Sequence, residues 1–269
     1  MTGFLGPNGA GKTTTMRALL GLLRPSAGEA LVEGRRAAEL SEPLRTIGAA
    51  LEATAFHPGR SGRNHLRALA AAARIPRPRV EEVLELVELR EAARRRVGGY
   101  SLGMRQRLAL AAALLGDPRI LILDEPANGL DPQGMRWLRD LLREQAAAGR
   151  TVLVSSHVLS EIAQVADELI VIRAGRLVSQ TTLAEFTERG GRRMRVRAGD
   201  LEPLTAALVE AGATVERDGE SALLVAGLDG ARIGETALAR GIALHELAPV
   251  GATLEDRFLE VMDDGEGGT

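Results

Sequence analysis

The chain has 269 residues, 45% of them hydrophobic, and a formal net charge of -2 at pH 7. This length and apolar content indicate a soluble globular protein with one large domain, or one large and one small domain. The weak net charge argues against nucleic acid as a partner, and the absence of cysteine excludes disulfides, thiolate metal sites and cysteine nucleophiles.

The first part of the chain alternates between strand and helix patterns. Residues 2–5 are predicted to form a short buried strand, and residues 13–23 have the apolar spacing of a helix. Further strands are expected at residues 29–32 and 46–51. A stretch rich in alanine and arginine follows with helical spacing, so we expect a helical subdomain over about residues 62–115.

The same alternation continues to residue 189. Strands are predicted over residues 120–123, 151–154 and 169–172, and helices over residues 101–115, 132–147 and 158–165. Such alternation is typical of a mostly parallel sheet covered by helices, so residues 1–189 are predicted to form an α/β domain.

The pattern changes after the predicted linker at residues 190–193. Residues 190–262 show strands and helices in the order βαββαβ, with a further helix at residues 254–262, and a small α+β ferredoxin-like domain would satisfy this order. No motif here carries chemistry, so we interpret the region as a structural or regulatory accessory domain. The acidic, glycine-rich residues 263–269 are predicted to be a disordered tail.

The segment after the first strand fits the pattern of a phosphate-binding loop, in which two glycines separated by four residues precede a lysine and a hydroxyl residue. Backbone N–H groups of such a loop face a phosphate, the lysine reaches the β- and γ-phosphates of a nucleotide, and the next hydroxyl binds Mg²⁺. The alternative is a tight turn with an accidental lysine, against which the flanking strand and helix argue. The candidate nucleotide-binding residues are Gly6, Pro7, Asn8, Gly9, Ala10, Gly11, Lys12, Thr13 and Thr14, with Thr13 also a metal ligand.

Lys12 is the only lysine among the 34 lysine and arginine residues. Codon bias toward arginine explains the arginines but not this exception. A planar guanidinium does not replace the compact ammonium that a phosphate loop needs, so the lysine at this one position supports the loop interpretation.

Asp124 and Glu125 follow the continuous apolar run of residues 120–123 and precede Pro126. A buried strand that ends in two adjacent carboxylates can deliver Asp124 to a bound metal and Glu125 toward a nucleophilic water. The alternative is that the two acids only cap the next helix. The phosphate loop in the same chain favours the catalytic interpretation.

At this point the sequence resembles the ABC ATPases, P-loop NTPases that power ABC transporters. The segment Tyr-Ser-Leu-Gly-Met-Arg-Gln-Arg at residues 100–107 is similar to their LSGGQ signature, with Ser101 and Gly103 matching and Leu102 and Met104 departing from it. The order of motifs also fits, and the resemblance covers roughly residues 2–189. It is strongest to subunits of drug or peptide exporters whose membrane domains are separate chains.

This resemblance implies the remaining site and partners. Two such subunits sandwich two ATP molecules, so Ser101 and Gly103 of one subunit face the phosphate loop of the other. Asp131 resembles the D-loop residue at this interface, and His157 the switch histidine that contacts the γ-phosphate; a lone histidine is otherwise most often structural. ATP and Mg²⁺ are the implied cofactors. The partners are a second ABC subunit, here a homodimer or a paired subunit, and an integral membrane permease.

Glu52 occupies the position where the family usually has glutamine, so we expect it to contact Mg²⁺ or the attacking water. The loop after it, residues 57–64, is where the family receives the permease, although a solvated loop is the plain alternative. No run of about 20 apolar residues occurs, so we expect no direct membrane insertion. The expected location is cytoplasmic and peripheral, on the inner face of the plasma membrane.

Three functional hypotheses remain open from the sequence. The chain drives substrate export as an ATPase, acts on DNA or ribosomes as a soluble ABC protein, or is a relic that no longer hydrolyses ATP. Soluble ABC proteins carry long coiled-coil insertions or two cassettes joined by a charged linker, and this sequence has neither. Mg²⁺-dependent ATPase activity and a neighbouring permease gene would separate the three.

The amino end is expected to be incomplete. Residues 2–5 supply four residues before the loop, against a typical strand of five or six. The family also places further strands and an adenine-stacking aromatic residue upstream. We interpret Met1 as a start codon assigned too late, with a real truncation as the alternative.

Overall fold

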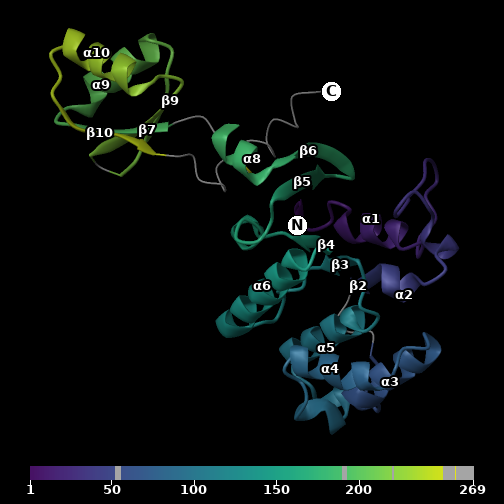
Figure 1. Cartoon of the computed structure of the whole chain (residues 1–269). Coiled ribbons are helices and arrows are strands. Elements are labelled where there is room, and N and C mark those ends of the chain that lie inside the picture. Colours follow the sequence, from purple (N-terminus) through teal and green to yellow (C-terminus); the bar gives the residue numbers. More distant parts are fainter. Residues whose placement is uncertain (52–55, 190–192, 220, 251–257, 259–269) are drawn as a thin grey trace. The chain divides into compact units, whose positions relative to one another are not determined.

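The computed structural model describes residues 1–51, 56–189, 193–219, 221–250 and 258 (Figure 1). The chain forms two compact units, residues 1–180 and residues 181–269.

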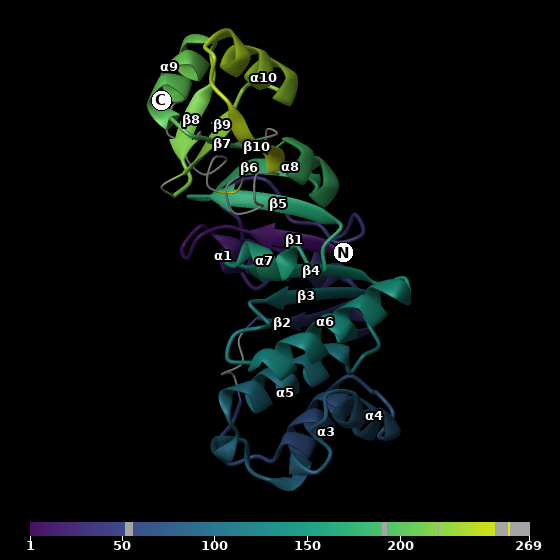
Figure 2. The ribbon, with the colours of Figure 1, turned by 90° about the vertical axis from the view of Figure 1, so that its left-hand side faces the viewer.

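The first unit is built on a sheet of six strands in the order β2-β3-β4-β1-β5-β6. Strands β1 to β5 all run parallel: β3 pairs with β2 and β4, and β1 pairs with β4 and β5. Figure 2 shows these strands side by side. The order differs from the chain order because helices connect the parallel strands, as expected for an α/β fold. The strands are β1 (Thr2–Leu5), β2 (Ile47–Ala50), β3 (Ile120–Asp124), β4 (Thr151–Ser156), β5 (Glu168–Arg173) and β6 (Arg176–Thr182).

Helices pack on this sheet and extend beyond its β2 edge. α5 lies next to β2, and α3 and α4 pack against α5 (Figures 1 and 2). No helix of the described residues is long and apolar enough to cross a membrane. The helices of this unit are α1 (Lys12–Leu19), α2 (Pro43–Thr46), α3 (Gly62–Ala72), α4 (Pro78–Leu86), α5 (Leu102–Leu114), α6 (Pro132–Ala147) and α7 (Leu159–Ile162).

The strand register brings the carboxyl ends of three strands together. In the parallel ladders Leu5 of β1 lies opposite Ser156 of β4, and Asp124 of β3 lies opposite Ser155. β3 is buried from Leu121 to Asp124, because sheet neighbours flank it and helices cover it. Polar residues at these ends therefore meet at one edge, where open α/β sheets bind ligands.

The strand predicted at residues 29–32 does not form. Val32 makes only an isolated bridge with Arg35 across a turn that contains Gly34, whose φ is 75°. A strand is stabilised by pairing with a neighbour, and none of the described strands pairs with this segment. Two helices are also shorter than predicted, since α1 ends at Leu19 and α7 at Ile162.

In its described residues the second unit contains α8 and, after it, an antiparallel sheet in the order β10-β7-β9-β8 with the helices α9 and α10. The elements after α8 follow the chain order βαββαβ, and a core that includes Val196, Leu204, Leu223 and Ile233 lies between this sheet and its helices. The likeness to a ferredoxin fold stays a prediction, and the expected helix at 254–262 and tail at 263–269 lie outside the described residues except Phe258. The elements are α8 (Leu183–Arg189), β7 (Arg193–Ala198), α9 (Leu201–Glu210), β8 (Thr214–Arg217), β9 (Ala222–Ala226), α10 (Gly230–Ala239) and β10 (Leu244–Val250).

β2 packs so closely on α5 that Gly48 has no room for a side chain. A Cβ atom there would lie 2.1 Å from the carbonyl oxygen of Ala113 and 2.7 Å from Pro118 Cγ. We expect Gly48→Ala to lower the free energy of unfolding by about 1 to 3 kcal/mol, because the helix backbone must shift. Urea unfolding followed by circular dichroism measures this. Gly99→Ala is the control, since no atom lies within 4 Å of its Cβ position, and equal losses for both variants would contradict the packing argument.

Candidate active site

The candidate site lies at the sheet edge where β1, β3 and β4 end. The loop of residues 6–11 connects β1 directly to α1, so α1 begins at this edge. Gly11 precedes α1 in a left-handed conformation and offers no side chain to cap it. The first N–H groups of the helix are therefore left for a ligand, and the helix dipole favours an anion there.

Glycines shape the loop itself. Gly9 and Gly11 have φ values of 81° and 105°, which side chains other than glycine rarely adopt. A Cβ on Gly6 would lie 2.4 Å from the carbonyl oxygen of Ile172 on β5. The N–H of Gly175 donates a hydrogen bond to the Ala10 carbonyl at 2.9 Å, which holds the loop against the turn after β5.

Lys12, the first residue of α1, is buried and folds back over this loop. Its Nζ donates hydrogen bonds to the carbonyl oxygens of Gly6 at 2.7 Å and Pro7 at 3.3 Å. The same ammonium forms an ion pair with Glu125 Oε1 at 3.3 Å. A compact positive charge is thus held between the loop and the end of β3, where it can neutralise an anion bound by the loop.

Thr13 and Asp124 bring a hydroxyl and a carboxylate together. Thr13 Oγ1 donates a hydrogen bond to Asp124 Oδ2 at 2.5 Å, and Ser155 Oγ donates one to Asp124 Oδ1. The Asp124 side chain is buried, so both of its oxygens take their partners from protein groups. Such oxygens are the ligands that Mg²⁺ prefers.

Glu125 lies next to Asp124 in a strained conformation. Its φ of 48° is left-handed, which costs a non-glycine residue about 1 to 2 kcal/mol. Hydrogen bonds hold this backbone: the Glu125 N–H donates to Ser155 Oγ at 2.9 Å, and its carbonyl accepts from Asn128 N at 3.2 Å and Gln106 Nε2 at 3.5 Å. The side chain reaches His157, whose Nδ1 is 2.8 Å from Glu125 Oε2. Strain that surrounding contacts fix is common at functional sites.

These residues fit a nucleoside triphosphate with Mg²⁺. The loop supplies N–H groups and a buried ammonium, and Thr13 and Asp124 supply two oxygen ligands. Among the described residues, no group of three or more histidine, aspartate or glutamate side chains could hold a metal ion. Mg²⁺ usually keeps water and substrate phosphate oxygens as ligands, so a site with few protein ligands suits a metal that binds together with a nucleotide.

Ser101, Gly103 and Asp131 lie in a second cluster of the same unit. Ser101 caps α5 by accepting a hydrogen bond from Met104 N at 3.2 Å, and Asp131 caps α6 by accepting one from Gly134 N at 2.7 Å. The two helix starts pack together, since a Cβ on Gly103 would lie 3.2 Å from the Gly129 carbonyl oxygen. Ser101 and Asp131 are both exposed, so their side chains are open to another molecule.

The structure thus joins Lys12, Thr13, Asp124, Glu125 and His157 by direct contacts. None of the hydrogen bonds or ion pairs that it describes links Ser101, Gly103 or Asp131 to that group, and Glu52 lies outside the described residues. Sequence reasoning missed Ser155 and Gln106. Ser155 lies two residues before His157, and Gln106 lies within the signature-like segment; these positions are the signals that could have pointed to them.

Comparison with known proteins identifies the family. The family model for ABC transporters matches residues 1–128, and a domain of unknown function (DUF8746) matches residues 192–255. The chain is 34% identical over 264 residues to the uncharacterized ABC transporter ATP-binding protein YdbJ of Bacillus subtilis (strain 168), a match that covers 96% of this chain and 85% of YdbJ. The chain belongs to the ABC transporter ATP-binding proteins. The resemblance drawn from the sequence motifs is confirmed.

Other members of this ABC family match 70% or more of the chain. The bacitracin transport ATP-binding protein BcrA of Bacillus licheniformis is 40% identical over 201 residues, which cover 74% of this chain and 66% of BcrA. The chain therefore spans just under two thirds of that relative. A solved structure described as an ATP binding subunit of an ABC transporter has a TM-score of 0.63 and 28% sequence identity, covering 70% of this chain and 81% of its own. The predicted ABC ATPase fold is confirmed.

Proposed function

We propose that the chain binds and hydrolyses ATP as the motor subunit of an ABC transporter. The observation that carries this proposal is the direct contact of Glu125 with both Lys12 and His157, beside the Thr13–Asp124 pair. In this proposal Lys12 is the phosphate-binding cation, Glu125 is the carboxylate base, and Thr13 and Asp124 are the metal ligands. Their mutual contacts at one edge of the sheet support these roles. Phosphoryl transfer needs these groups, because its catalysis is mainly positioning and charge stabilisation.

Each residue has a specific role in this proposal. Lys12 exchanges its loop carbonyl partners for the β- and γ-phosphates, while loop N–H groups hold the remaining phosphate oxygens. Thr13 and Asp124 would hold Mg²⁺, which would neutralise charge on the phosphates. Glu125 orients the attacking water and accepts its proton. His157 holds the Glu125 carboxylate in place through the hydrogen bond at Nδ1 and contacts the γ-phosphate.

We further propose that the working form is a dimer of such subunits. Ser101, Gly103 and Asp131 lie in a cluster separate from Lys12, yet Ser101 presents an exposed hydroxyl and helix start that suit an anionic ligand. Facing subunits would bring this cluster to the ATP held by the other chain. ATP binding would close the dimer and hydrolysis would open it.

The transport partner is an integral membrane permease, with export of a drug, peptide or similar substrate. The match to BcrA, named as a bacitracin transport protein, supports this substrate class. In this proposal the chain is cytoplasmic and peripheral on the inner face of the plasma membrane, and it does not bind nucleic acid. Glu52 and residues 57–64 would meet Mg²⁺ or water and the permease, respectively.

A mixed-dimer experiment tests the composite site. Lys12→Ala and Ser101→Arg chains, each alone, should fail to dimerise with ATP, because every site lacks one half. In a mixed dimer one site keeps both Lys12 and Ser101. Mixing should therefore restore ATP-dependent dimerisation, measured by size-exclusion chromatography.

Ser26→Arg is the matched control for the bulky substitution, because Ser26 is also an exposed serine and lies in a bend of the segment between α1 and α2. It should dimerise with ATP like the wild type. If the mixture of Lys12→Ala and Ser101→Arg chains dimerises no better than either variant alone, the facing-dimer proposal is wrong.

A further inference from the structure

Ser155 is the most completely buried polar residue at the site, with none of its surface exposed. It belongs to β4 and lies between the two strands that carry the candidate machinery. In the parallel ladders it is opposite Asp124 of β3 on one side and Phe4 of β1 on the other. The position of its side chain is therefore fixed by the pairing of β4 with its two neighbouring strands, and not by a loop.

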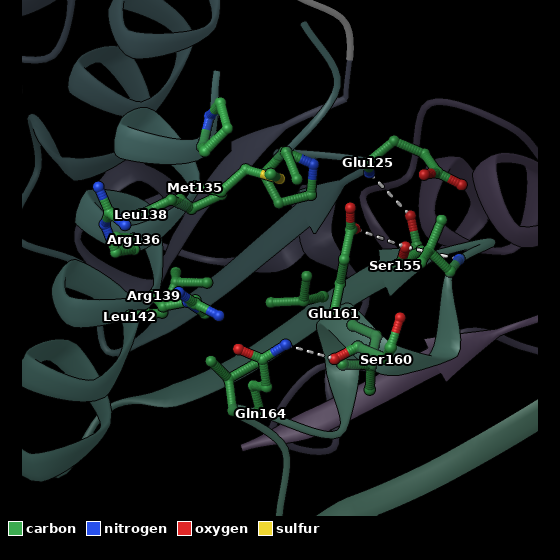
Figure 3. Close-up of a pocket in the computed structure, with 18 residues that line it drawn as sticks. Glu125, Met135, Arg136, Leu138, Arg139, Leu142, Ser155, Ser160, Glu161 and Gln164 are labelled. Atoms are coloured by element: carbon green, nitrogen blue, oxygen red, sulfur yellow. Dashed lines mark hydrogen bonds between the residues drawn. The ribbon is translucent and has the colours of Figure 1, made fainter. Parts of the chain in front are cut away.

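The Ser155 hydroxyl makes two hydrogen bonds, one to each neighbouring acidic residue. It donates to Asp124 Oδ1. It also accepts a hydrogen bond from the backbone N–H of Glu125 at 2.9 Å (Figure 3). A hydroxyl has one hydrogen to donate, and here the carboxylate takes it. The same oxygen therefore links the side chain of Asp124 to the backbone of Glu125.

Each of these bonds fixes a different catalytic feature. The bond to Asp124 Oδ1 sets the rotation of the carboxylate, which leaves Oδ2 facing Thr13 at 2.5 Å. The bond from the Glu125 N–H holds the left-handed backbone at φ 48°, from which the side chain reaches Lys12 and His157. Loss of the hydroxyl would release both acids together.

We propose that Ser155 is a positioning residue that aligns the magnesium ligand Asp124 and the base Glu125 as one unit. This inference rests on the proposed function for the identity of the metal and of the base. Hydrogen-bond partners that orient a metal ligand usually change metal affinity or activity by about 10- to 100-fold when they are removed.

Ser156 is a matched control on the same strand. It is also buried, with 3% of its surface exposed, but its hydroxyl points to a different set of partners. It accepts a hydrogen bond from Val158 N at 2.9 Å and donates one to Glu161 Oε2 at 3.1 Å. Removing this hydroxyl disturbs the turn that carries His157 but leaves both hydrogen bonds of Ser155 in place.

Threonine and valine at position 155 isolate the hydroxyl. The two side chains have nearly the same shape, and only threonine keeps the hydroxyl. Ser155 is among the residues that line a cavity of about 410 Å³, and threonine adds only one methyl group to its side chain. The comparison of Ser155→Thr with Ser155→Val therefore separates hydrogen bonding from packing, and Ser155→Ala removes the hydroxyl without adding bulk.

The decisive measurement is Mn²⁺ binding in the presence of ADP, followed by electron paramagnetic resonance, because it needs no turnover. We expect Ser155→Val and Ser155→Ala to weaken Mn²⁺ binding by about 10- to 100-fold, while Ser155→Thr and Ser156→Ala stay within about threefold of the wild type. ADP binding without metal should be unchanged in all four variants. In ATPase assays, Ser155→Val should lower kcat and raise the Mg²⁺ concentration needed for half-maximal rate.

The outcomes separate this inference from the proposed function. Equal Mn²⁺ affinity in Ser155→Thr and Ser155→Val would overturn the positioning role, as would an equal loss in Ser156→Ala. A wild-type chain that binds Mn²⁺ with ADP but does not hydrolyse ATP would overturn the proposed ATPase, while the metal-binding comparison still decides the role of Ser155. A wild-type chain that binds no Mn²⁺ with ADP would overturn both.

Discussion

Lys12→Ala is expected to reduce ATP affinity by at least about 100-fold. The ammonium is buried between the Gly6 and Pro7 carbonyls and the Glu125 carboxylate, so its loss leaves both the phosphates and Glu125 without their cation. Truncating one partner of a hydrogen-bonded charge pair in a complex typically costs about 2 to 5 kcal/mol of binding free energy, and a 100-fold loss of affinity corresponds to about 2.7 kcal/mol. Isothermal titration calorimetry with Mg²⁺ and ATP measures the effect.

Lys12→Arg extends this test to the unusual use of a single lysine. Arginine keeps the charge, but its planar fork does not match a pocket that holds a point charge between two carbonyl oxygens. We expect it to bind ATP nearly as poorly as Lys12→Ala. Arg67→Ala is the control, because it also removes one positive charge. Arg67 is exposed, and its ion pair with Glu81 has a long N–O distance of 3.8 Å. A Lys12→Ala protein with an affinity within threefold of the wild type would remove the phosphate-loop assignment.

The sequence was sufficient to predict the residues that we propose to bind phosphate. Glycines at residues 6, 9 and 11 and the lone lysine are local features, and their geometry depends on a few neighbouring backbone angles. Asp124 and Glu125 could be placed because the apolar run before them is a strand buried on both faces. Since parallel strands end at one edge, these two segments could be brought together without knowing the full topology.

Features that depend on contacts between distant segments could not be predicted in the same way. Ser155 acts through the register of β4 against β3, and the periodicity of either strand alone does not reveal which hydroxyl faces Asp124. Residues 29–32 have the composition of a strand, but strand formation depends on a pairing partner elsewhere in the chain. The packing of Gly129 against Leu102, where a Cβ would approach within 2.3 Å, likewise joins two motifs that sequence reasoning treated separately.

Burial of Tyr100 explains how the signature-like segment, residues 100–107, is held in place. Tyr100 is buried before α5 and donates a hydrogen bond from its hydroxyl to the Ala92 carbonyl at 2.8 Å. Desolvation raises the pKa of Tyr100, so the phenol stays protonated and keeps this hydrogen bond at physiological pH. The buried Tyr100 side chain thus holds the backbone directly before Ser101, while Ser101 itself stays exposed. The departures at Leu102 and Met104 leave this cap intact.

Glu125→Gln is expected to bind ATP while losing turnover by about 100- to 10,000-fold, the usual range for removing a general base. Glutamine keeps the shape of the side chain and can still hydrogen-bond to His157 Nδ1, now 2.8 Å from Glu125 Oε2. It cannot accept the proton of the attacking water. It also removes the negative charge 3.3 Å from the Lys12 ammonium, which leaves that cation free to bind phosphate.

We therefore expect Glu125→Gln to change two measured quantities, ATPase activity and the fraction of ATP-bound dimer, in opposite directions. ATPase activity falls, whereas the fraction of ATP-bound dimer on size-exclusion chromatography rises, because closure no longer leads to hydrolysis. Glu81→Gln is the control, since Glu81 is a partly exposed carboxylate that pairs with Arg63 at 2.8 Å in the helical subdomain and should change neither measurement. Turnover at the wild-type rate in Glu125→Gln would show that another group takes the proton. Loss of both turnover and ATP binding would instead mean that the carboxylate is needed to hold Lys12 in the loop.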